Sequence, residues 1–119
     1  MPSAVNSEVA APAAGSAEQA CAPAAGAPLN RAQADLLAVG LKAVADPARI
    51  RILSLLRAQP DGEACVCHLT GPLGLKQPTV SHHLKVLLDA GLVRREQRGI
   101  WAHYGIDEPA VAALASALA

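Results

Sequence analysis

The sequence describes a small protein of 119 residues, enough for one domain, with a formal net charge of zero. Hydrophobic residues make up 52% of it, but Phe is absent, and Trp101 and Tyr104 are the only large aromatic residues. The core must therefore be built from Leu, Ile and Val, which favours packed helices over a β-sandwich. No uncharged apolar stretch of about 18 residues occurs and no secretory signal opens the chain, so we expect a cytoplasmic protein outside the membrane.

The charges are unevenly distributed along the chain. All ten basic residues lie between Arg31 and Arg98, whereas the acids Glu8 and Glu18 precede them, so ten bases face eight acids in the remaining part, a net charge of +2. Over residues 76–103 five bases face two acids. A local basic surface of this kind attracts phosphate groups, and the zero net charge does not exclude a nucleic-acid partner.

Residues 1–28 consist of Ala, Pro, Gly and Ser with scattered polar residues. This segment shows no apolar period and cannot bury a face of its own. We predict a disordered N-terminal arm that carries Cys21, followed by one folded domain over residues 29–119.

The first two helices have recognisable ends. From Asn30 the apolar pattern is helical, and Asn30 is a suitable cap. Asp46 and Pro47 end this helix and begin a second over residues 47–58, because an Asp side chain caps free amides and proline suits the first helical position.

Two further helices, separated by a short glycine-containing turn, are predicted over residues 63–70 and 78–90. Two strands follow at 92–96 and 100–106 around a turn at 97–99, and we call this hairpin the wing. Helix, turn, helix and basic hairpin in this order predict a winged helix-turn-helix, whose second helix enters the major groove. The expected fold class is mainly α with a small β-hairpin.

The helix predicted over 78–90 has an apolar and a polar face. At 100° per residue, Val80 and Leu84 lie on the core side, His82 and Lys85 lie opposite, and His83 falls close to the apolar side, where we expect it to pack. An ordinary solvated face beside an ordinary charged hairpin is the alternative. We expect double-stranded operator DNA to be contacted by Thr79, Ser81 and His82 at base edges and phosphates, and by Lys85 and Arg98 at phosphates.

Two of the three cysteines are separated by one residue. The cytoplasm keeps thiols reduced, so they indicate metal binding or redox chemistry rather than a disulfide framework. On a regular helix Cys65 and Cys67 point about 200° apart, so both can bind one ion only if that turn distorts. Two sulfurs are too few for tight capture of a soft ion, and Cys21 is the only other thiol.

The identity of the further ligand determines which ion the site prefers. Three thiolates from Cys21, Cys65 and Cys67 suit As(III) or Sb(III), whereas a site of three cysteines and His68 suits zinc(II) or cadmium(II). Two other interpretations stay open: small buried cysteines, and a redox sensor in which the pair forms a bridge or Cys21 resolves an oxidised Cys65. An enzyme acting on an organic substrate finds little support, because no cofactor loop precedes a helix and no acid or base is spaced with the thiols.

Four separated motifs, in the right order, resemble the ArsR/SmtB family of metalloregulatory repressors. They are residues 41–53 (LKAVADPARIRIL), 65–69 (CVCHL), 77–84 (QPTVSHHL) and 101–104 (WAHY). The resemblance covers about residues 33–118. It adds Gln77 to the candidate DNA contacts and implies an apo protein that represses and an ion-bound protein that leaves the DNA.

The resemblance also implies a homodimer joined by the first and last helices, the last beginning at Pro109. Apolar stripes on these helices match it, with Leu37, Leu41, Val111, Leu114 and Leu118 as candidate interface residues.

The ion site of the arsenical and cadmium/lead sensors is similar to the pair Cys65 and Cys67. Thr70 stands where close arsenical sensors often carry a third cysteine, and cadmium-type members usually draw more than one cysteine from the arm, which here has only Cys21. Three sulfurs favour arsenite over cadmium(II), lead(II) or zinc(II). Residues 111–119 contain no acid or histidine, so we expect no zinc site on the last helix.

Overall fold

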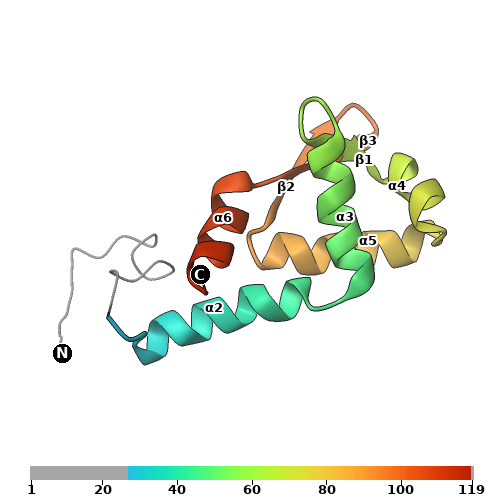
Figure 1. Cartoon of the computed structure of the whole chain (residues 1–119). Coiled ribbons are helices and arrows are strands. Elements are labelled where there is room, and N and C mark those ends of the chain that lie inside the picture. Colours follow the sequence, from blue (N-terminus) through green and yellow to red (C-terminus); the bar gives the residue numbers. More distant parts are fainter. Residues whose placement is uncertain (1–26, 119) are drawn as a thin grey trace. The chain divides into compact units, whose positions relative to one another are not determined.

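The computed structural model describes residues 27–118 and is mainly helical, as predicted (Figure 1). Its antiparallel sheet has three strands, one more than the predicted hairpin. The described residues divide into two compact units, one made of residues 27–38 with 113–118 and the other of Val39–Ala112. Cys21 and most of the predicted arm lie outside the described residues. No helix among the described residues is long and apolar enough to cross a membrane.

The caps predicted for the first two helices are confirmed. Before α2 (Arg31–Val44), the Asn30 side chain accepts a bond from the amide of Gln33 at 2.9 Å, and the Gln33 side chain accepts one from the amide of Asn30 at 3.0 Å. Before α3 (Pro47–Ala58), Asp46 accepts a bond from the amide of Arg49. The bounds predicted for α3 are those observed.

The prediction of a helix over residues 63–70 is wrong in its first part. Strand β1 (Glu63–Cys65) pairs antiparallel with the C-terminal half of the hairpin, and helix α4 (Val66–Leu73) begins only after it. The helix then runs past the predicted break, because Pro72 forfeits a single amide bond. It ends at Gly74, which has a φ of +66° and whose amide donates to the Thr70 carbonyl.

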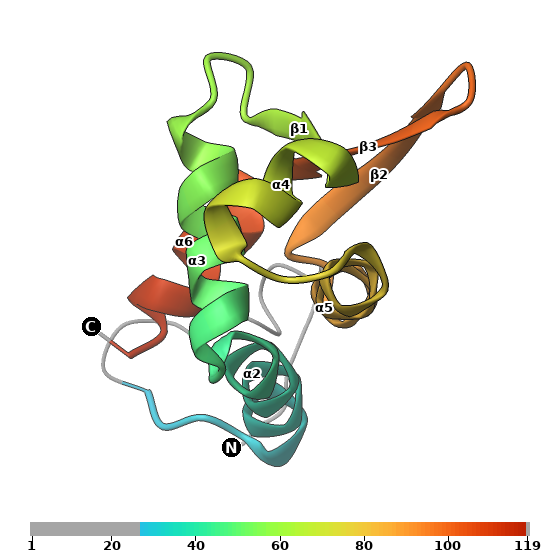
Figure 2. The same ribbon diagram turned by 90° about the vertical axis from the view of Figure 1, so that its right-hand side faces the viewer.

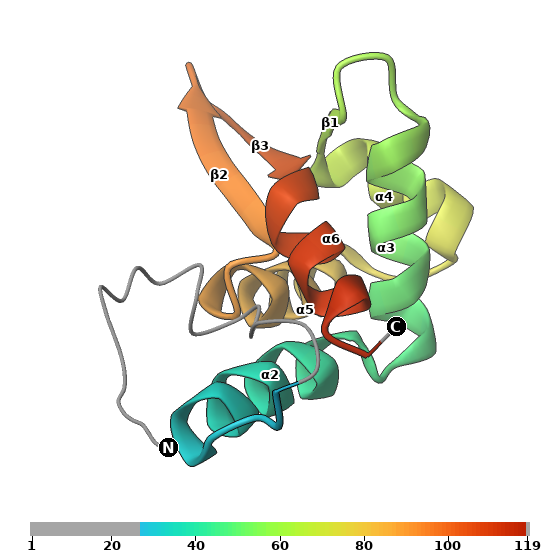
Figure 3. The same ribbon diagram turned by 60° about the vertical axis from the view of Figure 1, so that its left-hand side comes forward.

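Helix α5 (Gln77–Asp89) follows α4 after a short turn, which completes the helix-turn-helix (Figure 2). The strands of the wing are β2 (Val93–Arg98) and β3 (Trp101–Ile106), in the sheet order β1-β3-β2. Figure 3 shows β1 beside β3 at the base of the hairpin. The turn is Gly99 and Ile100, so Arg98, predicted in the turn, lies on the last strand pair.

The core of the unit formed by residues 39–112 is aliphatic, as the composition predicts. Its largest fully buried side chains come from α3, α4 and α5, which pack on one another. Val80, Leu84 and Leu87 of α5 are all fully buried, so the predicted core face of this helix is confirmed. The last helix, α6 (Glu108–Ser116), begins one residue before the predicted Pro109 and is capped by Asp107, which accepts a bond from the Ala110 amide.

The cap at Asp46 gives a prediction on stability. The bond from the Arg49 amide, together with the Arg49 charge, holds the pKa of Asp46 below its ordinary value. A depressed pKa stabilises the fold above the unfolded pKa, and this contribution is lost as the pH falls through the folded pKa. Asp46→Ala should therefore lower the Tm at pH 7, and the difference from wild type should shrink below about pH 4.

Thermal unfolding followed by circular dichroism between pH 3 and pH 7 measures this. Asp89→Ala is the control, because that exposed carboxylate pairs with the exposed Lys85 and should change the Tm little. An Asp46→Ala protein with the wild-type Tm at pH 7 contradicts the capping role.

Candidate metal centre and nucleic-acid interface

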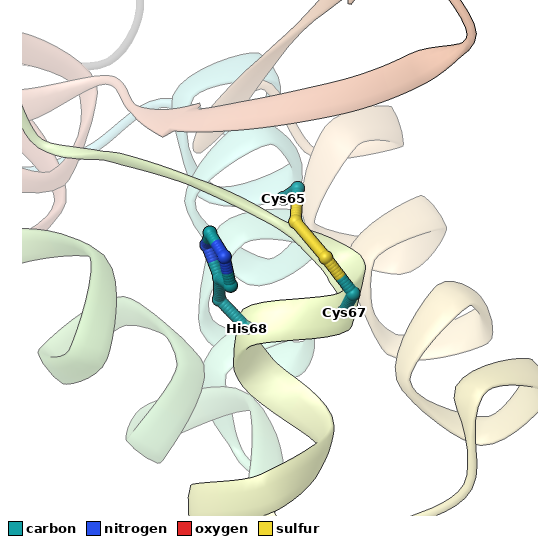
Figure 4. Close-up of side chains that lie close together, drawn as sticks. All are labelled: Cys65, Cys67 and His68. Carbon is teal, nitrogen blue, oxygen red and sulfur yellow. A yellow bond between two sulfur atoms is a disulfide. The ribbon is translucent and has the colours of Figure 1, made fainter.

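The two neighbouring cysteines belong to different elements. Cys65 is the last residue of β1 and the N-cap of α4, with extended backbone (φ −84°, ψ 162°), whereas Cys67 is the second residue of α4. Their Cα atoms are 5.4 Å apart and their sulfurs are joined in a disulfide (Figure 4). The expectation that both cysteines lie in one helix, so that a shared ion must distort it, is wrong, because Cys65 precedes the helix. The bridge between the pair is the one that the redox interpretation describes.

His68 completes a group of three metal-ligand side chains within the described residues. Its nearest ring nitrogen and the sulfurs of Cys65 and Cys67 all lie within 4.8 Å of one another. In Figure 4 the imidazole rises beside the joined sulfurs. Once reduced, the pair supplies two thiolates and His68 a nitrogen, a donor set that fits soft and borderline ions.

Other residues near the cysteines also bear on this site. The Thr70 hydroxyl donates to the Cys67 carbonyl at 3.1 Å, so this side chain stabilises the first turn of α4. Strand pairing places His103 of β3 directly opposite Cys65. This neighbour could not be predicted, because a three-residue strand is too short to show an alternating pattern.

The predicted DNA-contacting residues of α5 gather at its N-terminal half and outer side. Gln77, Thr79, His82 and Lys85 are exposed, while Ser81 is half-buried. No side chain caps the N-terminus of α5, and its first turn contains no acid. The free amides and this polar face can therefore receive an anion such as a phosphate.

His83 packs inside the unit, as predicted. Its Nδ1 is 3.1 Å from Nη1 of Arg49 and 4.0 Å from Oδ2 of Asp46. A guanidinium only donates, so Nδ1 of His83 is the acceptor in this bond. Arg49 in turn donates from Nε to the Ala43 carbonyl at 2.6 Å. This chain of bonds ties the DNA-reading helix to the junction between α2 and α3.

Both predicted phosphate contacts are held in ion pairs. Lys85 pairs with Asp89 at 3.1 Å, where both side chains are well exposed, and such a pair exchanges easily for a phosphate. Arg98 donates to Glu63 at 2.6 Å and to Glu96 at 2.9 Å. The hydrogen bond with Glu96 and the charge of Glu63 raise the pKa of Arg98 above its ordinary value. Both bonds use Nη2 of Arg98, so this nitrogen would have to leave the carboxylates before it could donate to a phosphate.

Comparison with known proteins identifies the family. The model described as bacterial regulatory protein, arsR family, matches residues 46–95. The arsenical resistance operon repressor of Bacillus subtilis (strain 168) is 40% identical over 75 residues, 63% of this chain and 70% of that protein. A cadmium resistance transcriptional regulatory protein of Staphylococcus aureus, a CadC homolog, is 31% identical over 87 residues, 67% of this chain and 70% of that protein. This chain belongs to the ArsR family.

A solved structure agrees with this assignment. It is the homodimeric winged helix-turn-helix DNA-binding domain (fragment 1–100) of a possible ArsR-family regulator from Mycobacterium bovis. The TM-score is 0.63 at 28% identity, and the match covers 78% of this chain and 86% of that one. The fold is therefore a winged helix-turn-helix, and the ArsR-family chain is a DNA-binding transcriptional regulator rather than an enzyme.

The candidate dimer residues of this ArsR-family chain differ in exposure. Leu37 is buried within the single chain, so it is the least available to a partner, whereas Leu41, Val111 and Leu114 are half-buried and Leu118 is exposed. Helix α2 also carries Leu36 and Val39, which are 47% and 53% exposed and lie off the predicted stripe.

The two adjacent histidines of α5 should behave differently when replaced. His82→Ala removes an exposed side chain from the DNA-reading face and should cost about 1–3 kcal/mol in binding to specific DNA, with little effect on nonspecific DNA. Fluorescence anisotropy with both DNAs measures the difference. His83→Ala, which removes the bond to Arg49, should instead lower the Tm. Equal losses on both DNAs for His82→Ala contradict its base-reading role.

Proposed function

We propose that this ArsR-family chain is a cytoplasmic repressor that binds operator DNA as an apo homodimer and leaves it when a thiophilic ion binds Cys65 and Cys67. The observation that carries the proposal is the meeting of these two sulfurs at the junction between β1 and α4. Helix α4 packs on α5, so the ion site lies one helix away from the DNA-reading face.

Arsenite or antimonite is the inducer that we propose first, with Cys21 as the third thiolate from either subunit of the dimer. Trivalent arsenic and antimony take three sulfurs, and the chain has three cysteines. The name of the Bacillus subtilis relative, an arsenical resistance operon repressor, supports this choice.

A divalent ion is the alternative inducer. The imidazole of His68 lies within 4.8 Å of both sulfurs, and a set of two sulfurs and one nitrogen suits cadmium(II), zinc(II) or lead(II) better than arsenite. The Staphylococcus aureus relative is named for cadmium resistance, which supports this alternative.

The geometry limits how an ion could act on DNA binding. Cys65 is fixed to the sheet by its pairing with β3, and Cys67 lies in the first turn of α4, so an ion bound by both would join a strand to a helix. No hydrogen bond of α4 has to break for this. The effect must therefore pass through the position of β1 and the packing of α4.

A panel of ions tests the proposed function. Reduced protein on operator DNA selected from a random pool is titrated with arsenite, antimonite, cadmium(II), lead(II) and zinc(II), with a phosphine reductant in place of competing dithiols. Cys65→Ser and Cys67→Ser should each weaken release about 100-fold or more, because they remove a direct ligand. Release of Cys65→Ser at the wild-type ion concentration contradicts the proposal.

The third ligand separates the two kinds of inducer. A need for Cys21 with tolerance of His68→Ala indicates the three-thiolate metalloid site. Loss of release in His68→Ala indicates the divalent site instead, with or without an effect of Cys21→Ser.

The disulfide between Cys65 and Cys67 favours a second candidate, a thiol redox sensor. Two thiols and one hydrogen peroxide give the disulfide and two waters, with two electrons passing from sulfur to oxygen. In that case peroxide should release the metal-free protein from DNA, the phosphine should restore binding, and Cys67→Ser should not respond. Ion and disulfide exclude each other, because both use the same sulfurs.

A further inference from the structure

The outer face of the sheet carries the cysteine strand and the basic residues of the wing together. Residues directly opposite across an antiparallel pair, and every second residue along a strand, share a face. The other face is buried near the base of the wing, where Ala64, Tyr104 and Ile106 lie in the core. The outer face holds Glu63 and Cys65 on β1, His103 and Gly105 on β3, and Arg94, Glu96 and Arg98 on β2.

The side chain of Arg98 is folded back along this face. Arg98 lies opposite Trp101 beside the turn, whereas Glu63 lies opposite Gly105 near the base of the wing. About 13 Å of strand separates these two positions. Nevertheless, Nη2 of Arg98 is 2.6 Å from Oε1 of Glu63, as well as 2.9 Å from Oε1 of Glu96. The guanidinium therefore points from the tip of the wing toward the cysteine strand.

The sheet makes space for Glu63. A Cβ at Gly105 would lie 3.0 Å from Cγ of Glu63 and 3.0 Å from Nη2 of Arg94, so the glycine leaves room for both side chains. Arg94 is itself fixed, because it donates from Nη1 to the Ile106 carbonyl. The Glu63 side chain is 19% exposed and that of Glu96 is 61% exposed. Of the two partners of Arg98, Glu63 is thus the one held in place.

Glu63 and DNA compete for Arg98. A guanidinium that binds a carboxylate does not offer the same N–H groups to a phosphate. Glu63 also lies two residues before Cys65 on a strand of three residues. Whatever fixes Cys65 therefore fixes the backbone of Glu63, about 7 Å away.

We propose that Glu63 is the positioning residue through which the cysteine site controls the wing. An ion that joins Cys65 to Cys67 holds β1 against α4, and Glu63 then keeps Arg98 folded back from the DNA phosphates. Without the ion, β1 is held by its pairing with β3 but is no longer joined to α4, and Arg98 exchanges Glu63 for a phosphate. In this structure a disulfide joins the two sulfurs and Arg98 is folded back onto Glu63. The proposal rests on the proposed function and adds the route from sulfur to DNA.

A matched pair of variants, Glu63→Gln and Glu96→Gln, tests the proposal. Each removes one negative charge beside Arg98 on the same face, but only Glu63 lies on the cysteine strand. Operator affinity of the reduced full-length protein is measured over a salt series, without ion and with arsenite or cadmium(II). Circular dichroism checks that each variant is folded.

When the ion binds, the operator affinity of both wild-type protein and Glu96→Gln should depend less steeply on salt concentration. The slope of log K against log salt should flatten by about 0.9 per subunit, which is one phosphate contact. In Glu63→Gln the slope should not change, and the ion should weaken DNA binding about fivefold less than in wild type. Arg98→Ala should show the flatter slope already without ion and no further change with it.

The proposal is overturned if the ion flattens the salt slope of Glu63→Gln as much as that of wild type. It is also overturned if the ion no longer flattens the slope of Glu96→Gln. Direct titration of Glu63→Gln with the ion shows whether its cysteine site is intact. Failure of the proposed function looks different, because then no ion releases the wild-type protein from DNA.

If no ion releases the wild-type protein, the ion-free measurements test the competition for Arg98. Glu63→Gln should raise operator affinity about fivefold in wild type and not in Arg98→Ala, and the absence of this gain overturns the competition for Arg98.

Discussion

The pairing of β1 with β3 is the constraint on which the candidate site depends. It holds the backbone of residues 63–65 extended, so that Cys65 caps α4 instead of lying in it. In a continuous helix the two sulfurs would point about 200° apart. With the strand in place they meet at the first turn of α4. Three ladder positions thus bring together two sulfurs that a continuous helix would keep apart.

The same strand connects the thiol pair to the DNA-binding parts on two sides. After Cys65 the chain enters α4, which packs on α5. Before it, Glu63 contacts Arg98 of the wing. A second connection is independent of the thiols, because Arg49 joins His83 of α5 to the Ala43 carbonyl at the end of α2. The DNA-reading helix is therefore supported by both the sheet side and the α2–α3 junction.

Most of the fold could be predicted because its signals are local. The N-termini of α2 and α3 are marked within four residues of sequence, by Asn30 and Gln33 for the first and by Asp46 and Pro47 for the second. The core face of α5 follows from helical periodicity, and its end from Gly91 with a φ of +77°. The order of these elements was sufficient for the winged helix-turn-helix.

The rest could not be predicted because it depends on distant partners or on segments too short to show a pattern. β1 has three residues, fewer than an alternating period needs. The position of Arg98 is set by Glu63, which lies 35 residues earlier. The proximity of His68 to both sulfurs follows from the strand-to-helix transition, and helical spacing alone does not contain it.

The two sulfurs differ in access to solvent, so the more exposed one should react first. Cys65 is 5% exposed, whereas Cys67 lies in an exposed position at the start of α4. An incoming nucleophile therefore reaches the sulfur of Cys67 first, and Cys65 departs as the leaving thiolate. An arriving ion likewise meets Cys67 before Cys65. In the proposed function the outer cysteine would therefore be the first ligand of an arriving ion, and the inner one would close the site.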